Sequence, residues 1–408
     1  MLELWSSSNQ MAKWLRTTGG KDPEEDAVKS KTLHWALLVA ALAVVAFAVI
    51  ACGSDEPADT TAATSGPETT AAGETATTEA AETTTTAAGE EMPYFELSLS
   101  MHDPVTSNNG KFYQAWADQI YEATDGHVEI VLYGSSSLAA AADVGEMVET
   151  GGVDIGWVFT SFYAGQFPLT DVTTIPMVGF GDAMVSTKTL LDLYDKYPEL
   201  QAEWENYKLL NLYGNPGMLF CSVDAPIEKP ADLKGLVLRT PAGPITSMVT
   251  NLGASPIVMA PPDMYEALEK RNITGYVFEP AGITNFKLEE VTNYATDMPL
   301  YDGAFGLVMN WDKWNSLPPE YQTIIEESTG KTGSLAAAQD FNDAAAAAHK
   351  TIADAGCEWI TPTAEAIAEF QAAADVVAAE WPASIKLQGF DAEAYMQDAL
   401  SIAKSYSE

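Results

Sequence analysis

Between Lys229 and Lys287 the sequence alternates short apolar runs with amphipathic runs, and this alternation restricts the segment to folds built from β–α units. It predicts strands at 236–240, 256–259 and 276–279, and helices at 243–252 and 261–271. The second helix begins at the pair Pro261 and Pro262, because proline suits the first turn of a helix. The segment therefore predicts an α/β domain.

Arg239 lies inside the first of these strands, between Leu238 and the turn at Thr240 and Pro241. An arginine at this depth in an apolar strand is costly to bury alone, so it requires a partner. Its planar fork of N–H donors suits a carboxylate that is held at two points. The residues alone leave two interpretations open: the carboxylate of a ligand, or a salt bridge to one of the chain's own acidic residues.

The same alternation covers most of the remaining chain. Further strands are predicted at 95–101, 128–133, 153–159, 207–213, 218–223, 303–309 and 358–362. Later helices are predicted at 286–294, 318–355, 364–379 and 391–405. The number of elements predicts a folded part at 93–408 with two α/β lobes joined by crossing strands. We expect the first lobe to hold 93–217 with the C-terminal helices, and the second to hold 218–310.

Residues 1–52 have the features of a secretory signal. Basic residues precede an apolar run that ends at Val49-Ile50-Ala51-Cys52, which resembles the lipobox of bacterial lipoproteins. By that resemblance Cys52 becomes the lipidated first residue; an uncleaved membrane anchor is the alternative. Residues 53–92 are rich in Thr, Ala and Glu and predict a disordered tether. The expected location is extracytoplasmic, in the periplasm or lipid-anchored to the outer face of the cell membrane.

The composition excludes several classes of function. With 58 acidic and 20 basic residues the net charge is −38, which argues against nucleic acid as a partner and against docking of the protein surface onto anionic lipid. The sequence contains no phosphate-binding loop, no His-Glu-x-x-His zinc motif and no Gly-x-Ser-x-Gly elbow. His102 and Asp103 form a pair, but a loop after the first strand explains them. We therefore expect neither an enzyme nor a cofactor.

Several stretches resemble the substrate-binding proteins of TRAP (tripartite ATP-independent periplasmic) transporters, the DctP-like receptors. These stretches are DLKGLVLRTP at 232–241, LGASP at 252–256, YEAL at 265–268, FYAGQFPL at 162–169 and NWDKWNSLPP at 310–319. The resemblance implies a two-lobed periplasmic-binding-protein fold, type II-like, with crossing strands and a long helix that spans both lobes. It also implies an extracytoplasmic receptor that captures an organic acid, pairs its carboxylate with Arg239 and delivers it to the membrane subunits for secondary-active uptake. A ligand-sensing lipoprotein for a membrane kinase and a secreted hydrolase are the alternatives.

The resemblance also implies further ligand-facing side chains. These are Phe278 and Glu279 at the end of a strand, Phe162, Tyr163 and Phe180 in loops, and Asn310 at a strand end. Ordinary packing explains the aromatic residues equally well, and Asn310 is also placed to cap the helix that follows. Some family members use a glutamate at the place of Glu279 to hold a metal ion beside the substrate. A single glutamate is a weak metal signal, so no metal is expected, and a metal ion held by Glu279 beside the ligand is the alternative.

Two absences bear on the ligand and on the cysteines. Family members that bind sugar acids carry a second arginine in the crossing strand, whereas the matching place here is near Leu219, with no arginine nearby. The resemblance therefore favours a monocarboxylate, such as a 2-oxo, hydroxy or aromatic acid. Cys221 and Cys357 are either two buried thiols or a disulfide of an exported protein.

Overall fold

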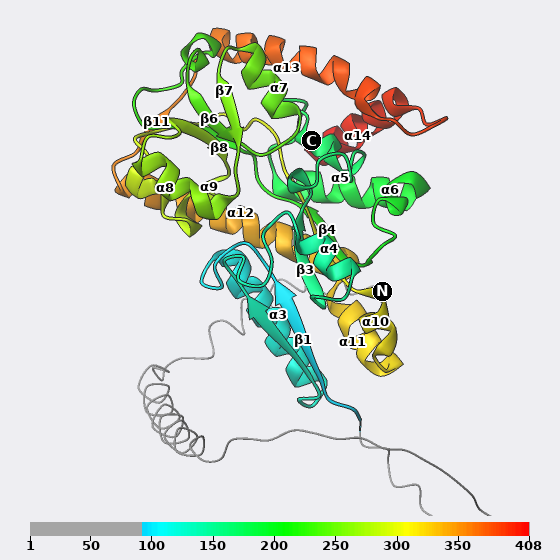
Figure 1. The fold of residues 1–408 in the computed structure, drawn as a ribbon. Coiled ribbons are helices and arrows are strands. Elements are labelled where there is room, and N and C mark those ends of the chain that lie inside the picture. The colour runs from blue at the N-terminus through cyan, green and yellow to red at the C-terminus, as the bar shows by residue number, and fades with distance from the viewer. Residues whose placement is uncertain (1–91, 408) are drawn as a thin grey trace, which may run out of the picture. The chain divides into compact units, whose positions relative to one another are not determined.

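The computed structural model describes residues 92–407, which form two β-sheets with helices packed around them (Figure 1). The first sheet has the strand order β2-β1-β3-β10-β4. Its strands are β1 (Phe95–Ser100), β2 (Val128–Tyr133), β3 (Ile155–Phe159), β4 (Lys208–Gly214) and β10 (Ala304–Met309). β1 runs parallel to β2 and β3, whereas β10 runs antiparallel to β3 and β4.

The second sheet has the strand order β11-β9-β5-β8-β6-β7. Its strands are β5 (Leu219–Ser222), β6 (Val237–Thr240), β7 (Ser255–Val258), β8 (Gly275–Phe278), β9 (Tyr294–Thr296) and β11 (Glu358–Ile360). β6 lies between β7 and β8 and is parallel to both, as expected for consecutive β–α units. Every residue of β5 and β8 is buried, so the middle of this sheet is covered on both faces.

Helices connect and cover the strands. They are α3 (Asn108–Ala123), α4 (Val144–Glu149), α5 (Ala183–Lys196), α6 (Pro198–Ala202), α7 (Pro244–Asn251), α8 (Met264–Glu269), α9 (Pro280–Asn285), α10 (Trp311–Ser316), α11 (Pro319–Ser328), α12 (Gly330–Asp354), α13 (Ala364–Ser384) and α14 (Ala392–Ser407). The two sheets with their helices confirm the predicted α/β class.

The longest helix, α12, packs against elements of both sheets. It contacts β4 of the first sheet and also α9, which directly follows β8 of the second (Figure 1). The predicted single helix at 318–355 is instead divided into α11 and α12. The break falls at Thr329, because Gly330 has a φ of +60° and Thr329 is extended. α12 therefore connects the two lobes, because it packs against a strand of one and a helix of the other.

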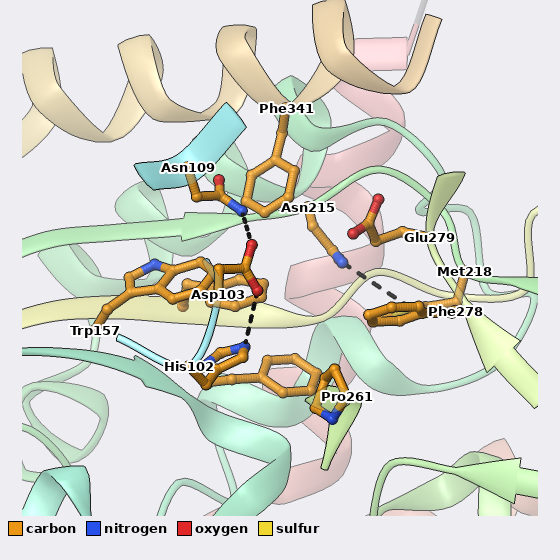
Figure 2. Close-up of a pocket in the computed structure, with 12 residues that line it drawn as sticks. His102, Asp103, Asn109, Trp157, Asn215, Met218, Pro261, Phe278, Glu279 and Phe341 are labelled. Carbon is orange, nitrogen blue, oxygen red and sulfur yellow. Dashed lines mark hydrogen bonds and ion pairs between the residues drawn. The ribbon is translucent and has the colours of Figure 1, made fainter. Parts of the chain in front are cut away.

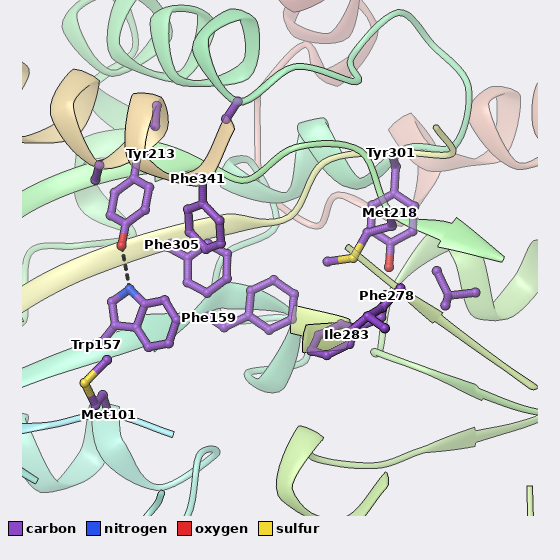
Figure 3. Close-up of a cluster of buried hydrophobic side chains, with 14 of the residues drawn as sticks. Met101, Trp157, Phe159, Tyr213, Met218, Phe278, Ile283, Tyr301, Phe305 and Phe341 are labelled. Atoms are coloured by element: carbon purple, nitrogen blue, oxygen red, sulfur yellow. Dashed lines mark hydrogen bonds between the residues drawn. The ribbon is translucent and has the colours of Figure 1, made fainter. Parts of the chain in front are cut away.

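Aromatic side chains fill the space between the sheets. Trp157 and Phe159 of β3 and Phe305 of β10 form a stack that continues to Phe341 of α12, and Phe278 of β8 lies nearby (Figure 3). All five side chains are buried. The largest apolar cluster of the described chain thus runs from one sheet to the other.

Two sequence expectations differ from the structure. The lobe boundary expected near residue 310 falls after β10, yet β10 lies in the first sheet, between β3 and the edge strand β4. The helix expected at 286–294 is also wrong. The helix here is α9, which begins at Pro280 and ends before Phe286; a short 3₁₀ turn at Leu288–Val291 and strand β9 follow it.

The predicted signal, the lipidation site Cys52 and the tether lie outside the described residues. Within residues 92–407, the helices are all too short or too polar to cross a membrane. Cys221 and Cys357 are both buried and both free, so the disulfide interpretation is not supported here.

Candidate functional site

A cavity of about 20 Å³ lies between the two sheets, at the point where the aromatic cluster ends (Figure 2). Twelve residues line it: His102, Asp103, Asn109, Trp157, Phe159, Asn215, Met218, Pro261, Phe278, Glu279, Phe305 and Phe341. They come from strands of both sheets, from the segments that adjoin these strands, and from α3 and α12, so the cavity is complete only when these parts are together. A cavity of this size admits one or two water molecules.

Stacked aromatic side chains form the apolar walls of the cavity. The Trp157 and Phe305 rings stack with centroids 4.8 Å apart and planes 14° apart, and Phe159 stacks on Phe305 at 4.7 Å. Phe341 adds a tilted ring at 5.5 Å from Phe305. Walls of this kind favour a flat or apolar ligand body, because aromatic rings gain from stacked and edge contacts.

Arg239 lies in β6, where it pairs in register with Tyr276 of β8, and its side chain is only 1% exposed. Its Nε donates to the Met259 carbonyl oxygen at 2.9 Å, and its Nη1 donates to the Val277 carbonyl oxygen at 2.9 Å. The guanidinium carbon lies 5.1 Å from the centre of the Phe278 ring, which lines the cavity. The two carbonyl bonds fix the plane of the guanidinium against this wall.

The third nitrogen of this guanidinium, Nη2, has no hydrogen-bond partner among residues 92–407. No carboxylate of the described chain lies within 4.0 Å of Arg239, so the salt-bridge interpretation finds no partner there. Burial lowers the pKa of Arg239 to about 10, so the side chain remains charged at neutral pH. A buried charge of this kind requires an anion, and an unpaired N–H is ready to bind one.

Two acidic side chains, Asp103 and Glu279, also line the cavity, and they are 4% and 5% exposed. Asp103 accepts a hydrogen bond from Asn109 Nδ2 at 2.9 Å and one from Asn285 Nδ2 at 3.3 Å. Glu279 has one oxygen, Oε2, without a partner among the described residues. Burial raises the pKa of Asp103 to about 6 and that of Glu279 to about 8. Glu279 is therefore largely protonated at neutral pH.

His102 contributes an aromatic face rather than a charge. Its ring stacks on Trp157 with centroids 4.5 Å apart, and the edge of Phe162 approaches it at 5.4 Å. Burial, helped by the charge of Arg239, lowers the pKa of His102 to about 3, so the ring is neutral at physiological pH. Phe162 thus supports the cavity wall from behind, although it does not line the cavity itself.

The remaining candidates from the sequence lie elsewhere. The Tyr163 hydroxyl donates to the Ala141 carbonyl at 2.9 Å and accepts from the Gly145 N–H at 3.0 Å, so it ties a loop to the start of α4. Asn310 caps α10 by accepting from the Lys313 N–H at 2.8 Å. Phe180 is buried but does not line the cavity. Of the predicted ligand-facing residues, the structure brings Phe278 and Glu279 to the cavity. Arg239 does not line the cavity itself, but its guanidinium contacts the Phe278 ring.

Several lining residues were not predicted as ligand contacts, because their roles depend on pairing between distant segments. In the sequence, Trp157 and Phe305 are typical apolar residues of buried strands, and they come together only because β10 pairs with β3. The His102 and Asp103 pair offered a signal, since polar residues that directly follow a buried strand often face a site at the sheet edge. We found no group of three or more His, Cys, Asp or Glu side chains in residues 92–407 arranged to hold a metal ion.

Comparisons with known proteins agree with this arrangement. The model of the family described as bacterial extracellular solute-binding proteins, family 7 (DctP), matches residues 99–384. The 2,3-diketo-L-gulonate-binding periplasmic protein YiaO of Escherichia coli is 27% identical over 217 residues, which cover 53% of this chain and 66% of that protein. This match therefore spans slightly less than two thirds of the relative.

Solved structures match over a larger part of the chain. A TRAP solute-binding protein from an unidentified marine microbe, specific for aromatic acid ligands and solved with 3-hydroxybenzoate, is 25% identical with a TM-score of 0.73, and the match covers 78% of this chain and 100% of that one. A TRAP periplasmic solute-binding protein from Bordetella bronchiseptica with bound (R)- and (S)-mandelate is 25% identical with a TM-score of 0.70, over 76% and 99% of the two chains. The two-lobed fold predicted from the sequence is that of these proteins.

Proposed function

Because this chain belongs to family 7 of the bacterial extracellular solute-binding proteins, we propose that it captures a small organic monocarboxylate between its two sheets. The ligand carboxylate binds the guanidinium of Arg239, and the body of the ligand lies between the aromatic walls. The protein then delivers the acid to the membrane subunits of a TRAP transporter. The family consists of binding receptors, and we propose no catalytic role.

The observation that carries this proposal is the unpaired Nη2 of Arg239. The guanidinium is buried, charged and held by two backbone carbonyls, yet it meets no acid of the described chain. A ligand carboxylate supplies both the missing charge and the missing acceptor. A charge-assisted hydrogen bond of this type contributes about 1.5–3 kcal/mol.

The walls favour an aromatic or similarly flat acid. Trp157, Phe159 and Phe305 line the cavity as one stacked aromatic group, and the two solved relatives described above hold 3-hydroxybenzoate and mandelate. An acid of that size requires more than 20 Å³, so we propose that the lobes separate to admit the ligand and close over it, in a hinge motion.

We further propose that the protein works outside the cytoplasm, tethered through a lipid on Cys52. The support for this is the signal-like segment at 1–52 and the acidic, threonine-rich segment at 53–92. A long tether would let the receptor stay near the membrane while its lobes open and close.

The test compares each acid with its uncharged amide. A thermal-shift screen of aromatic and 2-oxo monocarboxylates on the purified protein identifies the acid that stabilises it most, by mass action. Calorimetric titration of this acid and of its carboxamide then measures the requirement for charge. We expect the acid to bind at least about a hundredfold more tightly. Equal affinities for acid and amide, or no stabilisation by any acid, would contradict the proposal.

A further inference from the structure

We propose that Glu279 recognises a hydroxyl group on the ligand body, so that the preferred substrates are hydroxylated monocarboxylates rather than unsubstituted acids or dicarboxylates. This inference rests on the proposed function, since it assumes that the carboxylate of the ligand binds Arg239. It adds a second polar contact, between a hydroxyl of the ligand and the Glu279 carboxyl group in the cavity wall.

The Glu279 carboxyl group is buried and packed against the backbone at the cavity wall. It lies at the end of β8, directly before α9, and a Cβ at Gly282 would collide with its Oε1, so only glycine allows the carboxyl to pack this closely on the backbone. Its other oxygen, Oε2, is buried and has no hydrogen-bond partner among the described residues. A buried polar atom without a partner is destabilising, and a ligand group that pairs with it recovers this free energy.

Asp103, the other acidic residue of the cavity, differs from Glu279 because it already has hydrogen-bond partners within the protein. Two side-chain amides donate to it, Asn109 at 2.9 Å and Asn285 at 3.3 Å, so its hydrogen-bonding capacity is partly used within the protein. It reaches the cavity from the first sheet, whereas Glu279 reaches it from the second (Figure 2). The negative charge of Asp103 repels a second carboxylate, and this argues against a dicarboxylate.

A hydroxyl matches Glu279 better than other groups do. Burial, with a smaller contribution from Asp103, raises the pKa of Glu279 to about 8, so near neutral pH its carboxyl group both donates and accepts hydrogen bonds. A hydroxyl has the same dual capacity, whereas a C–H edge leaves Oε2 unpaired. Sites that hydrogen-bond a substrate hydroxyl discriminate strongly against the analogue that lacks it.

The experiment measures hydroxyl preference by calorimetric titration with two matched pairs of acids: benzoate with 3-hydroxybenzoate, and phenylacetate with mandelate. For the wild type we expect the hydroxylated member of at least one pair to bind about tenfold or more tightly. Glu279→Leu should abolish this preference while the unsubstituted acid still binds. Glu279→Gln should keep part of it, because an amide also donates and accepts. Glu269→Gln, at an exposed glutamate of α8, is the control and should match the wild type.

The outcomes separate this inference from the proposed function. If the acids bind and require Arg239 but no hydroxyl preference exists, or if Glu279→Leu keeps the preference, the role of Glu279 is wrong and the receptor function stands. If none of the four acids binds, the aromatic monocarboxylate function is contradicted together with this inference. A melting curve of the unliganded Glu279→Leu and Glu279→Gln variants checks that both are folded, and Glu279→Gln alone supports or contradicts the inference if Glu279→Leu does not fold.

Discussion

Asn285 Nδ2 lies 3.3 Å from Asp103 Oδ2 and 2.8 Å from Asn108 Oδ1. Asn285 is the last residue of α9, the helix directly after β8 of the second sheet. Asp103 lies in the segment after β1 of the first sheet, and Asn108 is the first residue of α3. Asn108 in turn donates to Asp340 of α12 at 3.0 Å. One amide thus links the two sheets beside the cavity, and these contacts exist only while the lobes are together.

We therefore expect Asn285→Ala to favour the open arrangement of the lobes. Each hydrogen bond contributes about 0.5–1.5 kcal/mol, so ligand affinity should fall by roughly threefold to tenfold with little change in the melting temperature of the unliganded protein. Small-angle X-ray scattering at a fixed, subsaturating ligand concentration should give a larger radius of gyration than for the wild type. Asn315→Ala, at an exposed asparagine of α10, is the control. Wild-type affinity in Asn285→Ala would show that the link does not stabilise closure.

Two buried carboxyl groups away from the cavity contribute to the pH dependence of stability. Burial raises the pKa of Asp302 and that of Glu203 to about 8. The folded state then binds protons more tightly than the unfolded state. The resulting stability is fully present below the ordinary carboxyl pKa near 4 and is lost as the pH rises toward 8. The free energy of unfolding should fall by up to about 1.4 kcal/mol per pH unit for each group in this interval.

Urea unfolding at pH 5, 6, 7 and 8 measures this slope. Asp302→Asn should flatten it, because the asparagine does not titrate, whereas Asp263→Asn at an exposed position should leave it unchanged. A free energy of unfolding that rises between pH 5 and pH 8 in the wild type would contradict the assignment.

The lipid anchor predicted from the sequence has a direct test. Expressed with its complete N-terminal segment in a bacterial host and grown with radioactive palmitate, the protein should become labelled, and Cys52→Ala should lose the label. Cys357→Ser is the matched control, because Cys357 is buried in the folded part and should not affect labelling. An unlabelled wild-type protein would remove the lipid anchor from the proposal.

Local patterns predicted the elements around Arg239 closely. The strand expected at 236–240 is β6, the helix expected at 243–252 is α7, and the strand expected at 276–279 is β8, each within one or two residues. This agreement has a physical reason: each β–α unit carries its own apolar period and its own proline or glycine boundary. The break between α11 and α12 was missed because the helix-favouring residues at 319–327 and the alanine-rich run at 335–348 outweighed Thr329 and Gly330, although a glycine of positive φ is a common helix boundary.

The candidate site was predictable only in part. Arg239 stood out as a charged residue inside an apolar strand, a feature of the sequence itself, whereas Glu279 was named only through the family resemblance. The stack of His102 on Trp157 did not, because these residues meet through the pairing of β1 with β3. Asn310 and Tyr163 show the converse, since their side chains satisfy backbone groups of nearby loops and helices instead of facing the cavity. Residue type and order alone do not separate these roles.

The last prediction concerns Arg239. Arg239→Ala should weaken binding of the carboxylate at least about a hundredfold, about 2.7 kcal/mol, because it removes a charge-assisted contact and leaves the carboxylate unpaired in a closed site. Arg239→Lys keeps the charge but loses the planar fork, so its affinity should lie between those of the wild type and Arg239→Ala. Arg271→Ala, which removes an exposed arginine paired with Asp224, should bind normally.

Melting curves of the unliganded variants distinguish this role from a structural one. Arg239 has no acidic partner among residues 92–407, and its two hydrogen bonds to carbonyl oxygens are offset by an unpaired Nη2 and by the desolvation of its charge. The loss of these two bonds and of the side chain's packing is opposed by the relief of this desolvation cost, so the melting temperature of unliganded Arg239→Ala should stay within a few degrees of the wild-type value. A structural salt bridge predicts the reverse pattern, in which the unliganded variant melts early while the fraction that remains folded binds the acid normally. That pattern would remove Arg239 from the binding site.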